Sequence, residues 1–237
     1  MSQVDIVDSL FVNVKEVKTE DDLYERIVQL CVQPGTVQPD QNIIVVDNFY
    51  ADPMQIRQHA LQQEFRVFGN FPGRRTVSFA SSALKDKIQQ YLSEKIVLFP
   101  TPKDTDGQRD VYNGSFQIAT SRDHTWFHTD GGNNYAGVLF LTPDAPVQSG
   151  TGFYRFWDGT TTLREQLRNG NSKSINDASQ DKTKWQKVDS VGNVFNRLVL
   201  FKSNRFHKSM KYFGNTLEDA RLFQVFFFNT ESHVADA

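Results

Sequence analysis

The sequence from residue 111 onward is a row of short segments that favour β-strands. These segments are rich in β-branched or aromatic residues, and each is bounded by Gly, Asn, Asp or Pro. Short strands separated by turn residues are typical of a β-sandwich or jelly roll. We therefore expect a mainly β fold with flanking helices (α+β). The predicted strands cover residues 115–120, 136–142, 151–156, 197–202 and 220–229.

The sequence before residue 111 mixes helices with one strand. Residues 19–22 provide an acceptor side chain and an acidic first turn for a helix that continues through residue 30. Residues 42–47 form an apolar run that predicts a buried strand, and Asp52 followed by Pro53 begins a second helix. A third helix is predicted over residues 82–95. We expect these helices to pack on the outside of a sheet.

Length and polarity predict the domain organisation. The 237 residues suit one domain, in which residues 1–110 pack on a core formed by residues 111–230. Residues 159–193 interrupt that core with a polar insertion rich in Asn, Ser, Asp and Lys, and a short helix is expected over residues 162–168. Long loops in compact domains are commonly functional, so the insertion is a candidate lid.

Charge and cysteine content disfavour several classes of protein. The chain has 26 basic and 28 acidic residues, a net charge of −2, so nucleic acid is not an expected partner. Cys31 is the only cysteine, which excludes an internal disulfide and a cysteine-based zinc site. Residues 1–12 lack the features of a signal peptide. No segment approaches the roughly 18 apolar residues of a membrane span. We expect a cytoplasmic protein without a membrane partner.

Candidate metal ligands lie in the segment His128, Thr129, Asp130, which Gly131 and Gly132 follow. On an extended strand, residues i and i+2 point to the same face, so His128 and Asp130 can direct an imidazole and a carboxylate at one point. The two glycines allow the chain to turn away. The pattern alone is weak, because a surface turn with a capping Asp and a solvated His would look the same.

A second histidine and an arginine downstream strengthen this hypothesis. His207 follows an apolar strand and a polar bend, and two imidazoles with one carboxylate form the facial triad of ferrous oxygenases. Arg221 begins the most apolar strand, and a turn at residues 212–216 predicts a hairpin that places it beside the strand of His207. Its guanidinium can bind a carboxylate through two bonds. Alternatively, His207 is a core residue, and Arg221 only neutralises Glu218 or Asp219.

These residues, in this order, resemble a known enzyme family. His128, Asp130, His207 and Arg221, with Gly152 and Phe153 opening a middle strand, resemble the prolyl-4-hydroxylase-like branch of the Fe(II)/2-oxoglutarate oxygenases. The apolar strand near residue 45 and its Pro-started helix also resemble the entry of that branch, and the resemblance covers roughly residues 42–230. It implies a single oxygenase domain with a double-stranded β-helix (jelly-roll, cupin-like) core.

The resemblance also implies cofactors and roles. Iron would be held by His128, Asp130 and His207, and 2-oxoglutarate would chelate it while its far carboxylate meets Arg221. Family members often add a tyrosine hydroxyl at this carboxylate, but Phe140 and Ile118 stand near those positions, so Thr120 or Gln117 is the expected second contact. The implied reaction is hydroxylation by O₂ of an amino-acid side chain (peptidyl prolyl-like) or a small polar metabolite, with succinate and CO₂ as co-products and ascorbate as a candidate reductant.

Two other readings stay open at the level of the sequence. The first is a cupin-like metalloenzyme that does not use 2-oxoglutarate, and the second is a non-catalytic jelly-roll module that binds or has a structural role. The presence of Asp130 favours hydroxylation over halogenation, because the halogenating relatives lack this carboxylate.

Further residues are weaker candidates. His124 competes with His128 as a ligand or lies near the substrate, and residues 70–76 form a sharp turn with Arg74 and Arg75. That arginine pair could bind an anionic substrate, but solvated guanidinium groups are the commoner case. Four aromatic residues could line a pocket or belong to the core, namely Trp126, Trp157, Tyr135 and Tyr154.

Overall fold

The computed structural model describes residues 42–102, 112–157, 163–164 and 176–231. The chain divides into Met1–Asp40 and Gln41–Ala237, and the account below concerns the second unit. The helix predicted after residue 19 lies outside the described residues. None of the helices in the described ranges has the length and hydrophobicity needed to span a membrane.

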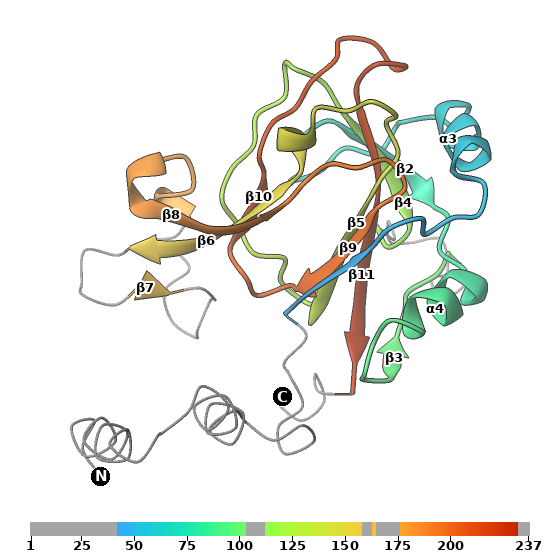
Figure 1. The fold of residues 1–237 in the computed structure, drawn as a ribbon, viewed down its shortest axis with the longest axis horizontal. Helices are drawn as coiled ribbons and strands as arrows, with labels where there is room; N and C mark the ends of the chain where they lie inside the picture. Colours follow the sequence, from blue (N-terminus) through green and yellow to red (C-terminus); the bar gives the residue numbers. More distant parts are fainter. Residues whose placement is uncertain (1–41, 103–111, 158–162, 165–175, 232–237) are drawn as a thin grey trace, which may run out of the picture. The chain divides into compact units, whose positions relative to one another are not determined.

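Most of the described strands belong to one large antiparallel sheet (Figure 1). Within the described residues it has 7 strands, in the order β1-β9-β5-β11-β4-β2, with β3 pairing to the end of β11. The bounds are β1 Ile43–Val46, β2 Arg74–Ser78, β3 Ile96–Leu98, β4 Ser115–Ala119, β5 Tyr135–Phe140, β9 Leu198–Lys202 and β11 Arg221–Thr230. All the strands predicted in this part of the sequence are confirmed to within a few residues.

A smaller sheet pairs strands around β6. Among the described residues it has 4 strands, in the order β10-β6-β7, with β8 also pairing to β6. The strands are β6 Thr151–Trp157, β7 Leu163–Arg164, β8 Trp185–Val191 and β10 His207–Ser209, and the short 3-10 helices are η2 Val147–Ser149 and η3 Lys182–Lys184.

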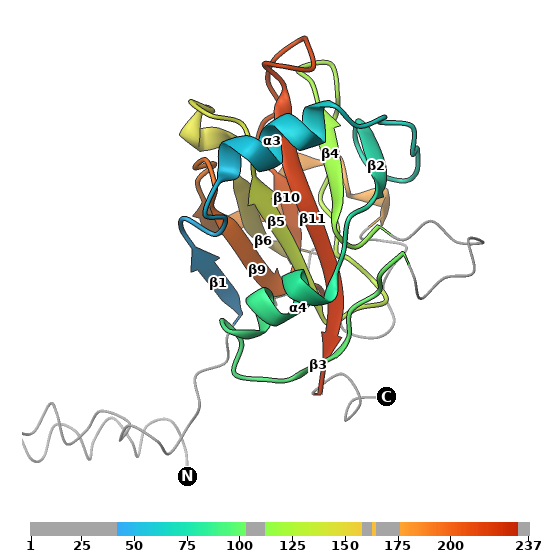
Figure 2. The ribbon, with the colours of Figure 1, turned by 90° about the vertical axis from the view of Figure 1, so that its right-hand side faces the viewer.

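Two helices cover one face of the large sheet (Figure 2). They are α3 Pro53–Leu61 and α4 Ser82–Gln89. Asp52 caps α3 by accepting a hydrogen bond from the amide of Gln55 at 3.0 Å, and Ser81 caps α4 in the same way. Both helices lie outside the sheet, as the sequence predicts.

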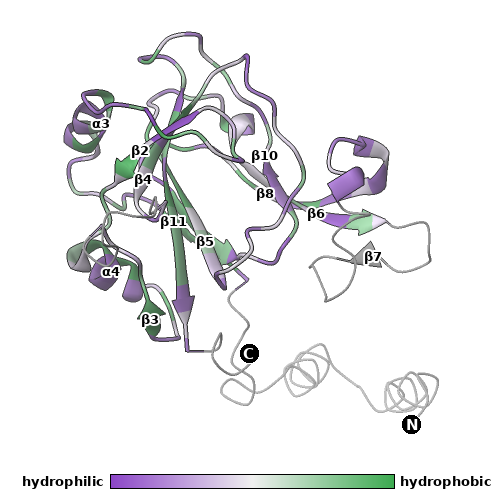
Figure 3. Ribbon diagram, turned by 180° about the vertical axis from the view of Figure 1, so that it is seen from behind, coloured by the Kyte–Doolittle hydropathy of each residue, from purple (hydrophilic) through white to green (hydrophobic). Residues whose placement is uncertain are grey.

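The large sheet is apolar on both faces. The face toward the helices buries Leu222 and Phe226 of β11 with Leu139 and Leu200, and the opposite face buries Phe223 and Val225. This alternation along β11 follows the two-residue period of a strand, and Figure 3 shows hydrophobic residues along much of β11. The second face carries Arg221 as well, and a functional cavity opens there.

The structure corrects two predicted helices. The helix predicted over residues 82–95 ends at Gln89, because the Gln89 side chain donates to the Glu94 carbonyl and accepts from the Ile96 amide, which turns the chain into β3. In the expected helix over residues 162–168, Leu163–Arg164 instead form β7 against β6, and the other residues lie outside the described part.

The structure also corrects the prediction that residues 159–193 are a polar insertion without strands. Residues 185–191 of the predicted excursion over 159–193 form β8, which pairs along β6. The sequence hides this strand because only Trp185 is buried, so no alternation of apolar and polar residues marks it. Residues 158–162 and 165–175 lie outside the described ranges, and the lid remains a prediction.

The last three residues of the turn expected over residues 70–76 instead begin β2, which covers Arg74–Ser78 at the edge of the large sheet. Gly73 precedes this strand with φ of +72°, and an added Cβ would lie 1.9 Å from the backbone oxygen of Ile118.

Gly73→Ala is therefore expected to lower the free energy of unfolding by about 2–4 kcal/mol in urea titrations. Gly131→Ala, where a Cβ would contact nothing within 4 Å, is the matched control. Equal stability of the two variants would contradict this.

Candidate metal centre

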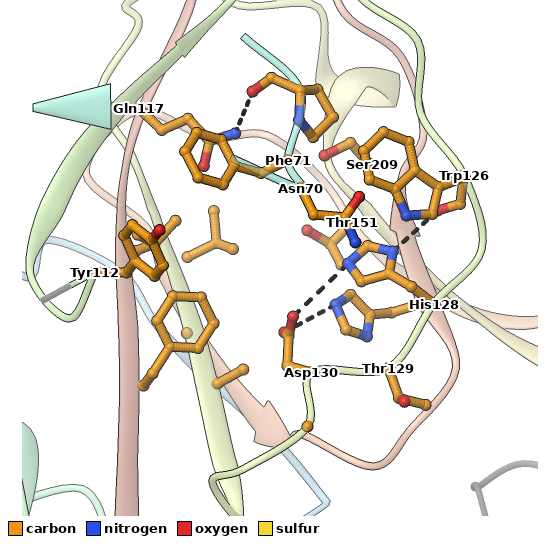
Figure 4. A pocket seen from close by; sticks show the side chains of 18 of the residues that line it. Asn70, Phe71, Tyr112, Gln117, Trp126, His128, Thr129, Asp130, Thr151 and Ser209 are labelled. Carbon is orange, nitrogen blue, oxygen red and sulfur yellow. Dashed lines mark hydrogen bonds and ion pairs between the residues drawn. The ribbon is translucent and has the colours of Figure 1, made fainter. Parts of the chain in front are cut away.

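His128 and His207 are brought together by a two-residue bridge between distant parts of the chain. The amide of His128 donates to the carbonyl of His207 at 3.1 Å, and the amide of His207 donates back at 2.9 Å. Asp130 is fixed two residues further, where its amide donates to the Ser203 carbonyl at 2.9 Å. The i, i+2 relation on the extended segment then turns the Asp130 carboxylate toward both rings (Figure 4).

The three side chains converge closely. Nε2 of His207 lies 3.2 Å from Oδ2 of Asp130, and Nε2 of His128 lies 3.8 Å from Oδ1. One ligand atom from each residue lies within 4.8 Å of the other two. A metal bonded at about 2 Å to each would separate neighbouring ligands by about 3 Å, so small side-chain adjustments suffice to close the site.

Hydrogen bonds orient both imidazole rings. Nδ1 of His128 lies 3.0 Å from the Trp126 carbonyl, and Nδ1 of His207 lies 2.9 Å from the Arg205 carbonyl. A carbonyl oxygen only accepts hydrogen bonds, so each Nδ1 carries a proton, and Nε2 is the ring atom that faces Asp130. Metal-binding histidines are held in this way in proteins.

Burial and mutual charge set the protonation of these groups. Burial, with a contribution from His207, lowers the pKa of His128 to about 4, so the ring is neutral near pH 7. For Asp130, burial alone would raise the pKa, but the charge and hydrogen bond of His207 outweigh it and the pKa is lowered. Two imidazoles and one carboxylate are the donor set that non-haem Fe(II) takes in a facial triad.

The triad opens into a cavity of about 1010 Å³ between the two sheets. The side chains of Phe223, Val225 and Phe227 of β11 form part of its wall on the large sheet. Thr151 of β6 and Ser209 of β10 line it from the small sheet, as Figure 4 shows. His128, Asp130 and His207 line this cavity, so the side of the triad that would hold a metal is accessible from it.

Arg221 does not lie where the sequence predicted. Its strand, β11, belongs to the large sheet, whereas His207 lies on β10 of the small sheet, so the predicted hairpin between their strands is wrong. Arg221 is instead fully buried behind Tyr212 and Phe223, two residues of the cavity wall. The turn does not form a hairpin because the chain crosses from one sheet to the other.

The Arg221 guanidinium is only partly satisfied. Its Nε donates to the Ser149 carbonyl at 3.1 Å, and Nη1 and Nη2 have no hydrogen-bond partner. Its Cζ lies 4.3 Å from the centre of the Phe223 ring. Burial lowers its pKa to about 10, so it stays charged at neutral pH. A buried cation with two unused donors is what an anionic ligand would complete.

The two residues expected as the second contact of the 2-oxoglutarate carboxylate, Gln117 and Thr120, differ in position. Gln117 lines the cavity, but its amide donates to the Pro72 carbonyl at 2.6 Å and accepts from Nε of Arg75 at 2.7 Å. The hydroxyl of Thr120 is bonded to Asp123 at 3.0 Å, and Thr120 is not among the lining residues. Phe140 and Ile118 are buried, and the Phe140 ring centre lies 5.3 Å from Cζ of Arg221.

The weaker candidates are placed as follows. His124 is exposed, and among the described residues it lies outside both the metal-ligand group and the cavity lining. Trp126 lines the cavity, Trp157 is exposed, Tyr135 stacks on Phe228 in the core, and Tyr154 packs edge-on against Phe127.

Of two further residues in the cavity wall, the sequence named Arg75 only as a weaker candidate and did not indicate Tyr212. Arg75 was expected to be solvated but is buried, and burial lowers its pKa to about 10. Arg75 lies on β2, which the sequence did not reveal because Pro72 and Gly73 indicated a turn and the residues of β2 do not alternate between apolar and polar. Tyr212 gave no signal, because only the crossing between the sheets brings it against Arg221.

The sequence matches a family described as "Family of unknown function (DUF6445)" over residues 28–211, more than half of the chain. The chain belongs to the DUF6445 family. No curated protein matches its sequence.

One solved structure shares the fold of this DUF6445 protein with a TM-score above 0.5, and others resemble it at lower scores. HygX from Streptomyces hygroscopicus, with nickel, 2-oxoglutarate and hygromycin B bound, has 12% identity and a TM-score of 0.52, and covers 82% of this chain and 88% of its own. A second HygX structure, with nickel and 2-oxoglutarate, has 14% identity and a TM-score of 0.48, covering 91% and 88%. A prolyl hydroxylase from Trichoplax adhaerens, in complex with a hypoxia inducible factor peptide, has 13% identity and a TM-score of 0.44, covering 84% and 88%.

Proposed function

We propose that this DUF6445 protein is an Fe(II)- and 2-oxoglutarate-dependent dioxygenase that hydroxylates a substrate. The observation that carries the proposal is the His128, Asp130 and His207 triad facing one cavity, with both rings oriented through Nδ1. Two histidines and one carboxylate with open positions are typical of ferrous oxygenases. HygX, which has the same fold, was crystallised with nickel and 2-oxoglutarate.

The strand order supports a double-stranded β-helix as the core. The central strands of the large sheet run β9, β5, β11, β4, and the small sheet runs β8, β6, β10, with His128 paired next to β10. The chain thus alternates between the facing sheets, as a jelly roll does. In this architecture the triad lies at one end of the small sheet, and the metal and 2-oxoglutarate would bind between the two sheets.

The residues of the chain fit the proposed cofactors. Nε2 of His128, Nε2 of His207 and a carboxylate oxygen of Asp130 would hold Fe(II). The unused Nη1 and Nη2 of Arg221 would bind the far carboxylate of 2-oxoglutarate once the side chains of Tyr212 and Phe223, which separate Arg221 from the cavity, move aside. Tyr212 lines the cavity beside Arg221, and its hydroxyl is a candidate second contact in place of Thr120 or Gln117.

When bound together, Fe(II) and 2-oxoglutarate supply the oxidation of a substrate C–H bond by O₂, with succinate and CO₂ as products. The chain itself orients the ligands and excludes water. Phe201, Phe223, Val225 and Phe227 form an apolar wall at the cavity, which strengthens each polar contact inside it. The requirement for ferrous iron accords with a reducing, cytoplasmic setting, and ascorbate is a candidate reductant.

Anaerobic addition of Fe(II) and 2-oxoglutarate to the purified protein is expected to produce a weak visible charge-transfer band. The band arises only when 2-oxoglutarate chelates Fe(II), so it separates this function from a cupin-like enzyme without the co-substrate and from a non-catalytic module. Absorption spectra with Fe(II) alone and with succinate are the controls. Absence of the band in the folded wild-type protein would refute the proposal.

A further inference from the structure

Arg75 is a buried cation in the wall of the cavity. It is 7% exposed, and Cζ lies 3.9 Å from the centre of the Phe71 ring, with the rings of Tyr112 and Phe227 at 5.2 and 5.6 Å. Its Nε donates to Oε1 of Gln117 at 2.7 Å. Stacking on Phe71 and the bond to Gln117 together fix the plane of the guanidinium.

The outer edge of this guanidinium has no protein partner. Among the described residues, neither terminal nitrogen of Arg75 forms a hydrogen bond, and no carboxylate lies within ion-pair distance. A guanidinium whose Nε is engaged still offers two parallel N–H groups to a planar anion. Since burying an unpaired charge is costly, such an arrangement in a binding cavity indicates a ligand.

Arg75 and the metal ligands line the same cavity from opposite sheets. Arg75 lies on β2, in register with Gln117 of β4, whereas His207 lies on β10 of the small sheet. Of the described residues that line the cavity, Arg75 is the only Lys or Arg. Arg221 lies behind the wall, so the two guanidinium groups mark separate places for anions.

The cavity is large enough for two small ligands. Its volume of about 1010 Å³ is at the upper end of the ~300–1,000 Å³ found for sites that hold one drug-sized molecule. Gln117, the polar side chain that contacts Arg75, is a neutral amide, and the cavity-lining carboxylate whose charge acts on Arg75 is Asp130 of the metal centre. The charge that could select a second ligand therefore comes from Arg75.

We propose that Arg75 binds a carboxylate of the substrate and so holds its reacting C–H bond toward the His128, Asp130 and His207 centre. The inference rests on the proposed function and narrows its substrate to a carboxylate-bearing compound, such as a free amino acid. Gln117 is then a positioning residue that orients Arg75, and Phe71 supports the guanidinium from one side.

The test compares Arg75→Gln with Arg74→Gln. Arg74 is the matched control, because it is adjacent on β2 but exposed, with Cζ 5.2 Å from the Phe68 ring centre. Each protein, loaded anaerobically with Fe(II) and 2-oxoglutarate, is titrated with free L-amino acids and with their carboxamides. Binding is read from shifts of the charge-transfer band and of the thermal unfolding temperature. Affinity for 2-oxoglutarate is measured in the same samples.

At least one carboxylate compound is expected to bind the wild-type complex, and its amide to bind far more weakly. Arg75→Gln should weaken binding of that carboxylate compound about 100-fold without changing the affinity for 2-oxoglutarate. Arg74→Gln should change neither of these two affinities. If Arg75→Gln does not fold, Arg75→Lys, which keeps the charge but not the planar fork, should weaken binding about tenfold.

Three results would overturn the inference while leaving the proposed function in place. They are equal binding of carboxylates to wild type and Arg75→Gln, binding of amides but of no carboxylate, and loss of 2-oxoglutarate affinity in Arg75→Gln. The last would mean that Arg75 holds the co-substrate. Loss of the band in the wild-type protein itself would instead refute the proposed function.

Discussion

Replacing His207 with alanine is expected to abolish retention of iron while the protein stays folded. His207 supplies the imidazole that comes from β10. Apart from His128 and Asp130, no described His, Asp, Glu or Cys belongs to the metal-ligand group, so none can replace it. Orienting partners of metal ligands are worth about 10–100-fold in affinity, so loss of a ligand itself should weaken Fe(II) binding by more than about 100-fold.

The fold should survive because it does not depend on the metal. The core clusters around Leu222, Phe226 and Phe223 are apolar, and the backbone bridge between His128 and His207 does not need the side chain. Some stability is lost, since the His207 ring lies 4.6 Å from that of Phe201 and its removal leaves a cavity.

The measurements are iron content after gel filtration and far-UV circular dichroism. His124→Ala is the matched control, because His124 is an exposed histidine of the same segment that lies outside the cavity lining, and it should retain iron fully. If His207→Ala unfolds, and wild type unfolds on treatment with a chelator, the metal is structural. If His124→Ala loses iron instead, the assignment of ligands is wrong.

Replacing Arg221 with leucine is expected to weaken 2-oxoglutarate binding on the order of 100-fold. The two unused nitrogens of a fully buried guanidinium are the proposed contact of the far carboxylate, and removing one partner of a buried charge pair costs about 2–5 kcal/mol. The measurement is titration of the charge-transfer band with 2-oxoglutarate. Retention of wild-type affinity would remove the role given to Arg221.

In the protein without 2-oxoglutarate, Arg221→Leu should maintain or increase stability. Without the co-substrate, Arg221 is a charge surrounded by Phe140, Tyr212 and Phe223, with only its Nε paired. An apolar side chain of similar reach removes that desolvation cost, so the thermal unfolding temperature of Arg221→Leu should be equal to or above that of wild type. A marked decrease would show that Arg221 is chiefly structural.

Two further variants distinguish the candidates for the second contact. Tyr212→Phe should weaken the binding of 2-oxoglutarate about tenfold, because it removes one hydrogen bond to a charged group. Thr120→Ala should leave the affinity unchanged, because the Thr120 hydroxyl is bonded to Asp123. The reverse result would restore the prediction made from the sequence.

Neighbouring residues in the chain specify the local features of this protein. The apolar strand predicted over residues 220–229, the capped start of α3 at Asp52 and the spacing of His128 and Asp130 each depend on such neighbours, and the structure agrees with all three. Prediction from the sequence failed where local signals were absent or misleading. Strand β8 is exposed along most of its length, and at β2 the residues Pro72 and Gly73 indicated a turn.

How these elements meet is set by tertiary packing. Local spacing could not show that β10 and β11 lie in different sheets, that Tyr212 reaches Arg221, or that Arg75 faces the cavity. Such contacts join residues far apart in the chain, and they are set by which strands pair and which faces are buried together. A strand's own sequence fixes which side chains share a face, whereas the identity of the facing strand comes from the packing of the whole core.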